Sequence, residues 1–262
     1  MFGGKASWTA AGEPRVSTPV SCIVYDLDGT LVDSIADIGA AVNRVREHYG
    51  LPPLEERLLR AFVGDGVARL IERAVFGLVD DKNLRPERTL PRSGASLEEV
   101  TDRYVAIYNE DPVIDTTLAD GADVALRYWR KQGTAQVVLT NKPHRVVLSI
   151  LERFEILQLF DLVLGAGASN DAGVFLPRKP DPKLLDYVFE QTGAPPEETY
   201  VVGDGVPDFE LAKAGGLRFV PILGGYTEPD RLLALAPDLD LAVPTFKDAY
   251  VLLRRLHGDP VP

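Results

Sequence analysis

Asp26 and Asp28 stand two residues apart, directly after a short apolar run and just before Gly29. In doubly wound α/β sheets, ligands bind beyond the carboxyl ends of the strands, so two carboxylates at such an end can point into one site. Gly29 lets the chain turn sharply there while backbone amides face a ligand. The alternative is an Asp-rich turn that only caps the next helix. It is disfavoured because other predicted strand ends carry similar groups.

Two further segments carry groups that suit an anion. Thr140 and Asn141 end an apolar run, where a hydroxyl and an amide can bind a phosphate oxygen, although this pair alone is also an ordinary helix cap. Lys179 stands between a loop and Pro180, just before a predicted helix, and a lysine fixed in this way is well suited to hold an anion. These positions predict an anion site, with phosphate as the first candidate.

Asp204 and Asp208 supply two more carboxylates after the β-branched run at 199–203. Oxygen ligands at a strand end suit Mg²⁺, which typically takes one or two carboxylates together with substrate oxygens and water. The sequence Val-Gly-Asp-Gly-Val occurs twice, at 63–67 and at 202–206, but the first copy follows a helical segment and lacks a second Asp four residues later. Only the second copy is therefore predicted to hold a metal.

Five short apolar runs must position these residues. They are predicted as strands buried on both faces, as in a parallel sheet covered by helices: residues 20–25, 135–140, 161–165, 199–203 and 217–222. Helices are predicted between them, one from residue 143 to about residue 154 and one opened by Asp181 and Pro182. Glycines stand where helices should end, at Gly133, Gly193 and Gly215. The alternation predicts a doubly wound, Rossmann-like parallel α/β sheet.

One long interval, residues 34–117, reads as helices only. It contains apolar stripes at helical spacing and two capping-box spacings, Ser34 with Asp37 and Ser96 with Glu99. The polar stretch at 78–96 is predicted to be a loop within it. We therefore predict a helical cap domain at 34–117, inserted into a core domain formed by 20–33 and 118–258, after a flexible tail at 1–19.

The composition restricts the classes of partner. The net charge of −11 argues against nucleic acid, and it requires local positive charge at any site for an anion. The single cysteine, Cys22, excludes an internal disulfide and is predicted to be a buried, inert thiol. No stretch approaches the roughly 20 apolar residues of a membrane span, and the first twenty residues lack a signal-peptide core. We expect a cytoplasmic protein, and the sequence leaves its oligomeric state open.

The ordered combination of these motifs resembles the haloacid dehalogenase (HAD) superfamily. The resemblance spans residues 20 to 225 and includes a helical insert after the first motif, as in the phosphoglycolate phosphatase group. Two positions depart from the family pattern. Gly205 stands where Ser or Thr is common, and Ala119-Asp120-Gly121 replaces the usual Pro-Gly turn. Both leave the expected catalytic groups in place.

The resemblance implies roles for the core motifs. Asp26 is expected to attack phosphorus, and Asp28 to act as general acid and then general base. It implies Mg²⁺ held by Asp26, the carbonyl of Asp28, Asp204 and Asp208. It also implies binding of the phosphoryl oxygens by the following groups: backbone amides around Gly29, Thr140, Asn141 and Lys179.

The resemblance further implies that the cap closes over the site and selects the substrate. The expected specificity residues are Gly64, Asp65, Gly66 and Arg69, with Arg69 equally open to being a solvent-facing helix residue. The role of Lys142 is left open between the site and solvent. A small phosphorylated metabolite is the expected substrate, and 2-phosphoglycolate is the first candidate because the start of the helix at Val67 could seat a carboxylate.

Three alternatives stay open at this point. A sugar-phosphate phosphatase or a β-phosphoglucomutase-like enzyme would use the same scaffold. A phospho-accepting signalling receiver also combines an Asp nucleophile, Thr, Lys and Mg²⁺ on an α/β fold. A receiver has a single domain of about 120 residues without an inserted cap and does not need Asp28 for turnover.

Overall fold

The structure is a computed structural model that describes residues 19–77, 89–90, 93–235 and 241–259. The predicted tail at 1–19 lies almost entirely outside the described residues, and so does most of the predicted loop at 78–96.

A parallel five-stranded sheet forms the centre of the molecule, in the order β5-β4-β1-β6-β7. The strands are β1 (Cys22–Tyr25), β4 (Ala135–Pro143), β5 (Leu162–Ala166), β6 (Thr199–Gly203) and β7 (Arg218–Pro221). The fully buried β1 pairs with β4 on one side and β6 on the other. The predicted α/β fold is confirmed, and the carboxyl ends of three neighbouring strands meet at one edge.

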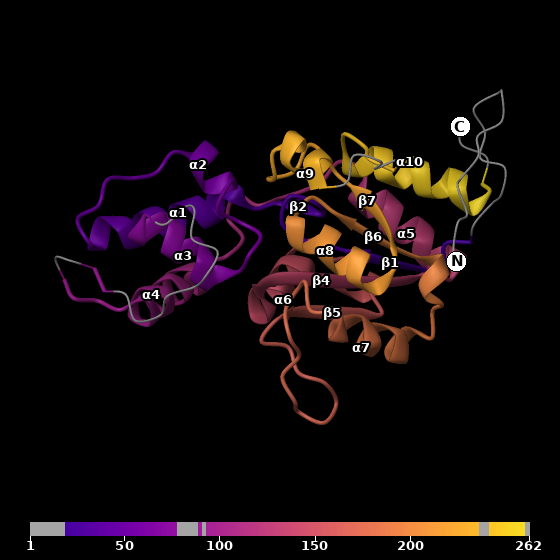
Figure 1. The fold of residues 1–262 in the computed structure, drawn as a ribbon, viewed down its shortest axis with the longest axis horizontal. Coiled ribbons are helices and arrows are strands. Elements are labelled where there is room, and N and C mark those ends of the chain that lie inside the picture. Colours follow the sequence, from indigo (N-terminus) through magenta and orange to yellow (C-terminus); the bar gives the residue numbers. More distant parts are fainter. Residues whose placement is uncertain (1–18, 78–88, 91–92, 236–240, 260–262) are drawn as a thin grey trace.

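Helices cover both faces of this sheet, as the apolar strands require. One face packs against α5 (Ala122–Gln132), α6 (His144–Arg153) and α10 (Phe246–His257), and the other against α7 (Lys183–Thr192) and α8 (Val206–Gly215). The short helix α9 (Pro229–Leu235) and two 3-10 turns, Leu157–Leu159 and Pro196–Glu198, complete the core. Figure 1 shows α10 and α7 on opposite sides of the sheet.

Several predicted boundaries shift by a few residues. Pro143 was expected to start a helix, but it ends β4 after a register irregularity, and α6 starts at His144. Gly133 and Gly193 end their helices in the left-handed conformation, as predicted. At the end of α8 the left-handed residue is Gly216 rather than Gly215.

The described part of the segment between β2 (Val32–Asp33) and β3 (Thr117–Leu118) contains four helices, and the two strands pair as a short antiparallel ladder. The helices are α1 (Ile35–His48), α2 (Glu56–Arg60), α3 (Val67–Phe76) and α4 (Leu97–Glu110). Figure 1 shows these helices gathered at one end of the molecule, beside the sheet. The chain thus leaves and re-enters the α/β part through two adjacent strands. The division into a core and a cap domain at residue boundaries stays a prediction.

One of the two predicted capping boxes is wrong. Ser96 and Glu99 form the expected reciprocal box at the start of α4. The Ser34 side chain makes no capping hydrogen bond, because it donates to Asp28 instead. The Asp37 carboxylate turns away from α1 and accepts from the chain that leads into β3. Its donors are three consecutive backbone amides and one hydroxyl, those of Ile114, Asp115 and Thr116 and the side chain of Thr116.

Two predictions from composition can be compared with the fold. Cys22 is fully buried, as predicted, and burial raises the pKa of its thiol to about 12, which disfavours the reactive thiolate. Among the residues that the structure describes, no helix is both long and apolar enough to cross a membrane.

We predict that Asp37→Ala lowers the free energy of unfolding by about 3 kcal/mol, because it leaves buried donors without an acceptor. Urea unfolding measures this loss. The matched control is Asp123→Ala, which removes an exposed carboxylate paired with Arg127 and should change stability by no more than about 0.5 kcal/mol. Equal stability of the two variants would show that Asp37 does not join α1 to the returning chain.

Candidate active site

Three carboxylates meet at the carboxyl edge of the sheet. Asp26 follows β1, Asp204 follows β6, and Asp208 lies in the first turn of α8. One carboxylate oxygen from each lies within 4.8 Å of the other two, and all three residues are buried. Because β1 and β6 are paired neighbours, their ends bring together residues 178 positions apart in the chain. The structure thus places the predicted motifs side by side.

Asp204 and Asp208 are held by hydrogen-bond donors from the surrounding loops. Asp204 accepts hydrogen bonds from the Thr30 hydroxyl at 2.8 Å and from the Tyr226 amide at 2.7 Å. Asp208 accepts from the Gly205 amide at 2.9 Å, so the glycine that departs from the family pattern still contributes its backbone donor. These contacts fix the carboxylates with oxygens facing one another.

Lys179 supplies the positive charge at this cluster. Its Nζ lies 2.8 Å from Asp26 Oδ1 and 2.6 Å from Asp208 Oδ1, with the side chain almost fully buried. Burial by itself lowers the pKa of Lys179, but the charges of Asp208 and Asp26 outweigh it and raise the pKa. Lys179 was predicted to bind phosphate. In the structure, Lys179 pairs with Asp26, which is the candidate nucleophile, and with Asp208.

The single positive charge of Lys179 does not balance the negative charges of three buried carboxylates. Burial, followed by repulsion from Asp26, raises the pKa of Asp204 to about 8 and that of Asp208 to about 7. Hard oxygen ligands in a buried, electronegative cluster fit a divalent cation such as Mg²⁺. The residues present therefore suit the metal that the sequence predicted.

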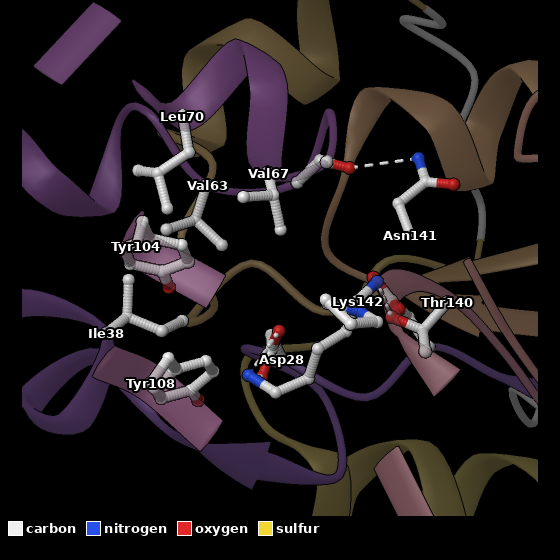
Figure 2. A pocket seen from close by; sticks show the side chains of 14 residues that line it. Asp28, Ile38, Val63, Val67, Leu70, Tyr104, Tyr108, Thr140, Asn141 and Lys142 are labelled. Atoms are coloured by element: carbon white, nitrogen blue, oxygen red, sulfur yellow. Dashed lines mark hydrogen bonds and ion pairs between the residues drawn. The ribbon is translucent and has the colours of Figure 1, made fainter. Parts of the chain in front are cut away.

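Asp28 lines a pocket between the sheet edge and the helices α1, α3 and α4, and Asp26 lines the same pocket. The carboxylate of Asp28 lies 3.0 Å from Lys142 Nζ and accepts from the Ser34 hydroxyl. Both Asp28 and Lys142 line this pocket, where Figure 2 shows the lysine reaching across from β4 toward Asp28. The sequence left Lys142 open between site and solvent, and the structure places it in the site. The only sequence feature that pointed to Lys142 was its position directly after Asn141.

The predicted phosphate ligands Thr140 and Asn141 also line the pocket. The Asn141 amide is engaged, because Nδ2 donates to the carbonyl of Gly64 at 3.1 Å and to that of Lys179 at 3.2 Å. The first of these bonds, drawn in Figure 2, joins the loop before α3 to the end of β4. Asn141 thus links the helical segment to the sheet, a role that its position as a helix cap did not reveal.

The four predicted specificity residues divide into two pairs. Gly64 and Gly66 line the pocket. Asp65 forms an ion pair with Arg73, and Arg69 forms one with Glu72, and neither lines the pocket. Asp65 thus meets a partner outside the pocket, which removes the repulsion that its charge would exert on an anion there.

Tyr226 connects the metal-ligand candidate to the base of the helical segment. Its amide donates to Asp204, and its hydroxyl donates to Asp33 Oδ1 at 2.8 Å. The Arg60 guanidinium lies 5.1 Å from the Tyr226 ring centroid and pairs with Asp33. The hydrogen bond between Tyr226 and Asp33 joins residues 193 positions apart, so no local sequence pattern indicates it.

A parallel sheet with these motifs at its carboxyl edge and helices inserted after its first strand defines a class of hydrolases. The model of the haloacid dehalogenase-like hydrolase family matches residues 23–222, and the chain belongs to this family. It is a phosphatase of this family and is similar to its phosphoglycolate phosphatase group.

The chain is similar to several bacterial proteins and to a solved structure. A "Phosphoglycolate phosphatase" of Cereibacter sphaeroides is 37% identical over 206 residues, which cover 78% of this chain and 85% of the relative. The protein of the same name from Chromobacterium violaceum is 31% identical over 235 residues, 90% of this chain and 97% of the relative. A crystal structure of a predicted phosphoglycolate phosphatase from Haemophilus somnus has a TM-score of 0.72 at 28% identity, covering 87% of this chain and 95% of the other.

We predict that Gly225→Ala lowers phosphatase kcat/KM by about 100-fold, because a small displacement of a catalytic group has this order of effect. A Cβ at Gly225 would lie 2.2 Å from the Cβ of Asp204, so the carboxylate or the loop must shift. The measurement is hydrolysis of 4-nitrophenyl phosphate, with the melting temperature recorded alongside. Gly193→Ala is the control, since its Cβ meets no atom within 4 Å and its left-handed φ of +65° should lower the melting temperature while leaving kcat/KM unchanged. Wild-type kcat/KM in Gly225→Ala would contradict the placement of Asp204.

Proposed function

We propose that the protein hydrolyses phosphate monoesters of small metabolites through a phospho-aspartate on Asp26, with 2-phosphoglycolate as the first candidate substrate. The observation that carries this proposal is the position of Asp26. Its carboxylate belongs to the buried cluster with Asp204 and Asp208, contacts Lys179, and lines the same pocket as Asp28.

The reaction needs two displacements at phosphorus. A carboxylate oxygen of Asp26 attacks the phosphorus, the bond from phosphorus to the ester oxygen breaks, and Asp28 gives its proton to that oxygen. Asp28 then takes a proton from a water molecule, whose oxygen attacks the phosphorus of the aspartyl phosphate and releases inorganic phosphate. Asp26 returns to a free carboxylate and Asp28 to the acid form.

Mg²⁺ is the proposed cofactor, held by the carboxylates of Asp26, Asp204 and Asp208 and by the carbonyl of Asp28. When bound, it would offset the repulsion between an anionic phosphate and anionic carboxylates. Two features would favour a bound cation. The three carboxylates are buried together, and Asp204 is fixed by hydrogen bonds from Thr30 and Tyr226.

The transferring phosphoryl group needs donors around its oxygens. Thr140 and the backbone amides that follow Asp26, including that of Gly29, are proposed to supply them together with Lys179. Lys179 is fixed by Asp208 beside the Asp26 oxygen, so its remaining N–H can reach an oxygen of a bound phosphate. Since Asn141 Nδ2 is engaged, its side chain is proposed to hold the adjacent loop rather than the phosphate.

The pocket favours a small substrate. Its empty volume is about 440 Å³ even when the part open to solvent is included. Cap residues form much of its wall, and the Asn141–Gly64 bond ties the cap loop to the core. We propose that residues 34–117 act as a cap that closes over the substrate. The names of the relatives and the small pocket together favour 2-phosphoglycolate over nucleotides or proteins.

The test is phosphoenzyme formation by Asp26→Asn. The amide has nearly the volume of the carboxylate but is a poor nucleophile, so turnover of 4-nitrophenyl phosphate and of 2-phosphoglycolate should both fall at least about 1,000-fold. Acid-quenched enzyme should carry label from ³²P-substrate only in the wild type and in Asp28→Asn, where both half-reactions are slower. Near wild-type turnover by Asp26→Asn would refute the nucleophile. Faster turnover of a hexose phosphate, or its isomerisation with a bisphosphate activator, would favour the mutase alternative.

A further inference from the structure

Lys142 is a buried cation that the proposed phosphoryl-transfer steps do not use. Its side chain is only 2% exposed, and its Nζ contacts Asp28 and lies 4.9 Å from the ring centroid of Tyr108. A lysine ammonium has three N–H donors. Within the described part of the chain, Asp28 is the one side chain that accepts from it, so donor capacity is left toward the pocket.

Tyr108 supplies a second donor in the same pocket. The residue is 3% exposed, it lines the pocket, and its hydroxyl has no hydrogen-bond partner among the described residues. Burial, followed by the charges of Asp28 and Asp37, raises the pKa of this phenol well above its usual value, so the hydroxyl keeps its proton. A buried donor without a partner costs free energy unless a ligand supplies the acceptor.

The remaining wall of this part of the pocket is apolar. It is formed by Ile38, Val63, Val67 and Leu70. Figure 2 shows Lys142 and Tyr108 on either side of the space next to Asp28, with these apolar side chains and Tyr104 above them. The ammonium of Lys142 and the hydroxyl of Tyr108 are hydrogen-bond donors beside apolar side chains. They favour a ligand group that only accepts hydrogen bonds and carries negative charge.

We propose that Lys142 and Tyr108 seat a carboxylate on the leaving group, so that the substrate is a phosphate ester of a short 2-hydroxy acid. The inference rests on the proposed function and names the residues that select its substrate. It differs from the sequence-based expectation that the amides at the start of α3 seat the carboxylate, because Lys142 and Tyr108 offer a full charge and an unpartnered donor.

The distance between Lys142 and Asp28 limits the length of the substrate. Lys142 Nζ lies 3.0 Å from the carboxyl group of Asp28, whose acid form is proposed to give its proton to the ester oxygen. A carboxylate bound by the same ammonium must therefore lie a few bonds from that oxygen. The two-carbon skeleton of glycolate meets this condition, whereas a carboxylate at the far end of a longer chain does not.

One group in the pocket favours a different ligand. Asn141 Oδ1 is a buried acceptor without a partner among the described residues, and a ligand hydroxyl would satisfy it. A polyhydroxylated leaving group, as in a sugar phosphate, is therefore the competing substrate class. The experiment below compares both classes.

The experiment measures selectivity between 2-phosphoglycolate and ethyl phosphate, which has the same two-carbon length but no carboxylate. Tyr108→Phe should lower the ratio of the two kcat/KM values by about tenfold or more, the usual worth of a hydrogen bond to a charged group. The matched control is Tyr128→Phe, which removes from α5 a buried hydroxyl that also has no partner in the described part of the chain. The control should leave the ratio at its wild-type value.

Binding gives a second readout that does not depend on turnover. In the Asp26→Asn background, calorimetry compares the affinities for 2-phosphoglycolate and ethyl phosphate, and Lys142→Gln should reduce the difference between them by at least about tenfold. An unchanged ratio in Tyr108→Phe together with an unchanged affinity difference in Lys142→Gln would overturn the inference. So would a wild-type preference for a hexose phosphate over 2-phosphoglycolate. Failure of the proposed function is distinct, because the wild type would then hydrolyse neither ester.

Discussion

The burial of Asp26, Asp204 and Asp208 within 4.8 Å of one another is the constraint on which the rest of the site depends. Three carboxylates repel one another in a medium of low polarity, so a stable fold must supply donors and positive charge around them. Lys179 provides one charge, and the loops that follow β1 and β6 provide hydroxyl and amide donors. The negative charge that is left unbalanced is the basis of the proposed affinity for a divalent cation, and through it for a phosphate.

The same contacts extend from the charged cluster to the helical segment. Tyr226 joins Asp204 to Asp33 at the base of that segment, and Asn141 joins its loop at Gly64 to the end of β4. Motion of the helices would therefore be transmitted through these hydrogen bonds to Asn141 and Asp204. On the other side of Asp28, Lys142 and Tyr108 place positive charge and a free donor where the leaving group must lie. The phosphoryl site and the specificity site thus share Asp28 as their boundary.

The sequence predicted the α/β fold, the helical insert and the four core motifs, because each depends on local patterns: apolar runs, helical stripes and polar residues at strand ends. It could not assign Ser34, Asp37 or Lys142. Ser34 and Asp37 have the spacing of a capping box, but their side chains bind elsewhere: Ser34 donates to Asp28, and Asp37 accepts from the amide of Thr116. Lys142 looks like any lysine near a helix start until the fold places Asp28 beside it. The contacts of Asp37 and Lys142 join residues 79 and 114 positions apart, and such contacts leave no trace in local spacing.

Titration of the protein with Mg²⁺ by calorimetry tests the central claim most directly, because it needs no substrate. The account predicts one Mg²⁺ bound per chain at neutral pH, with binding lost in Asp204→Asn and retained in Asp123→Asn, whose carboxylate is exposed on α5. Chelation with EDTA should abolish hydrolysis of 4-nitrophenyl phosphate, and Mg²⁺ should restore it, whereas Ca²⁺ should substitute poorly. No Mg²⁺ binding, together with full hydrolysis in EDTA, would contradict the claim that the three carboxylates form a metal site.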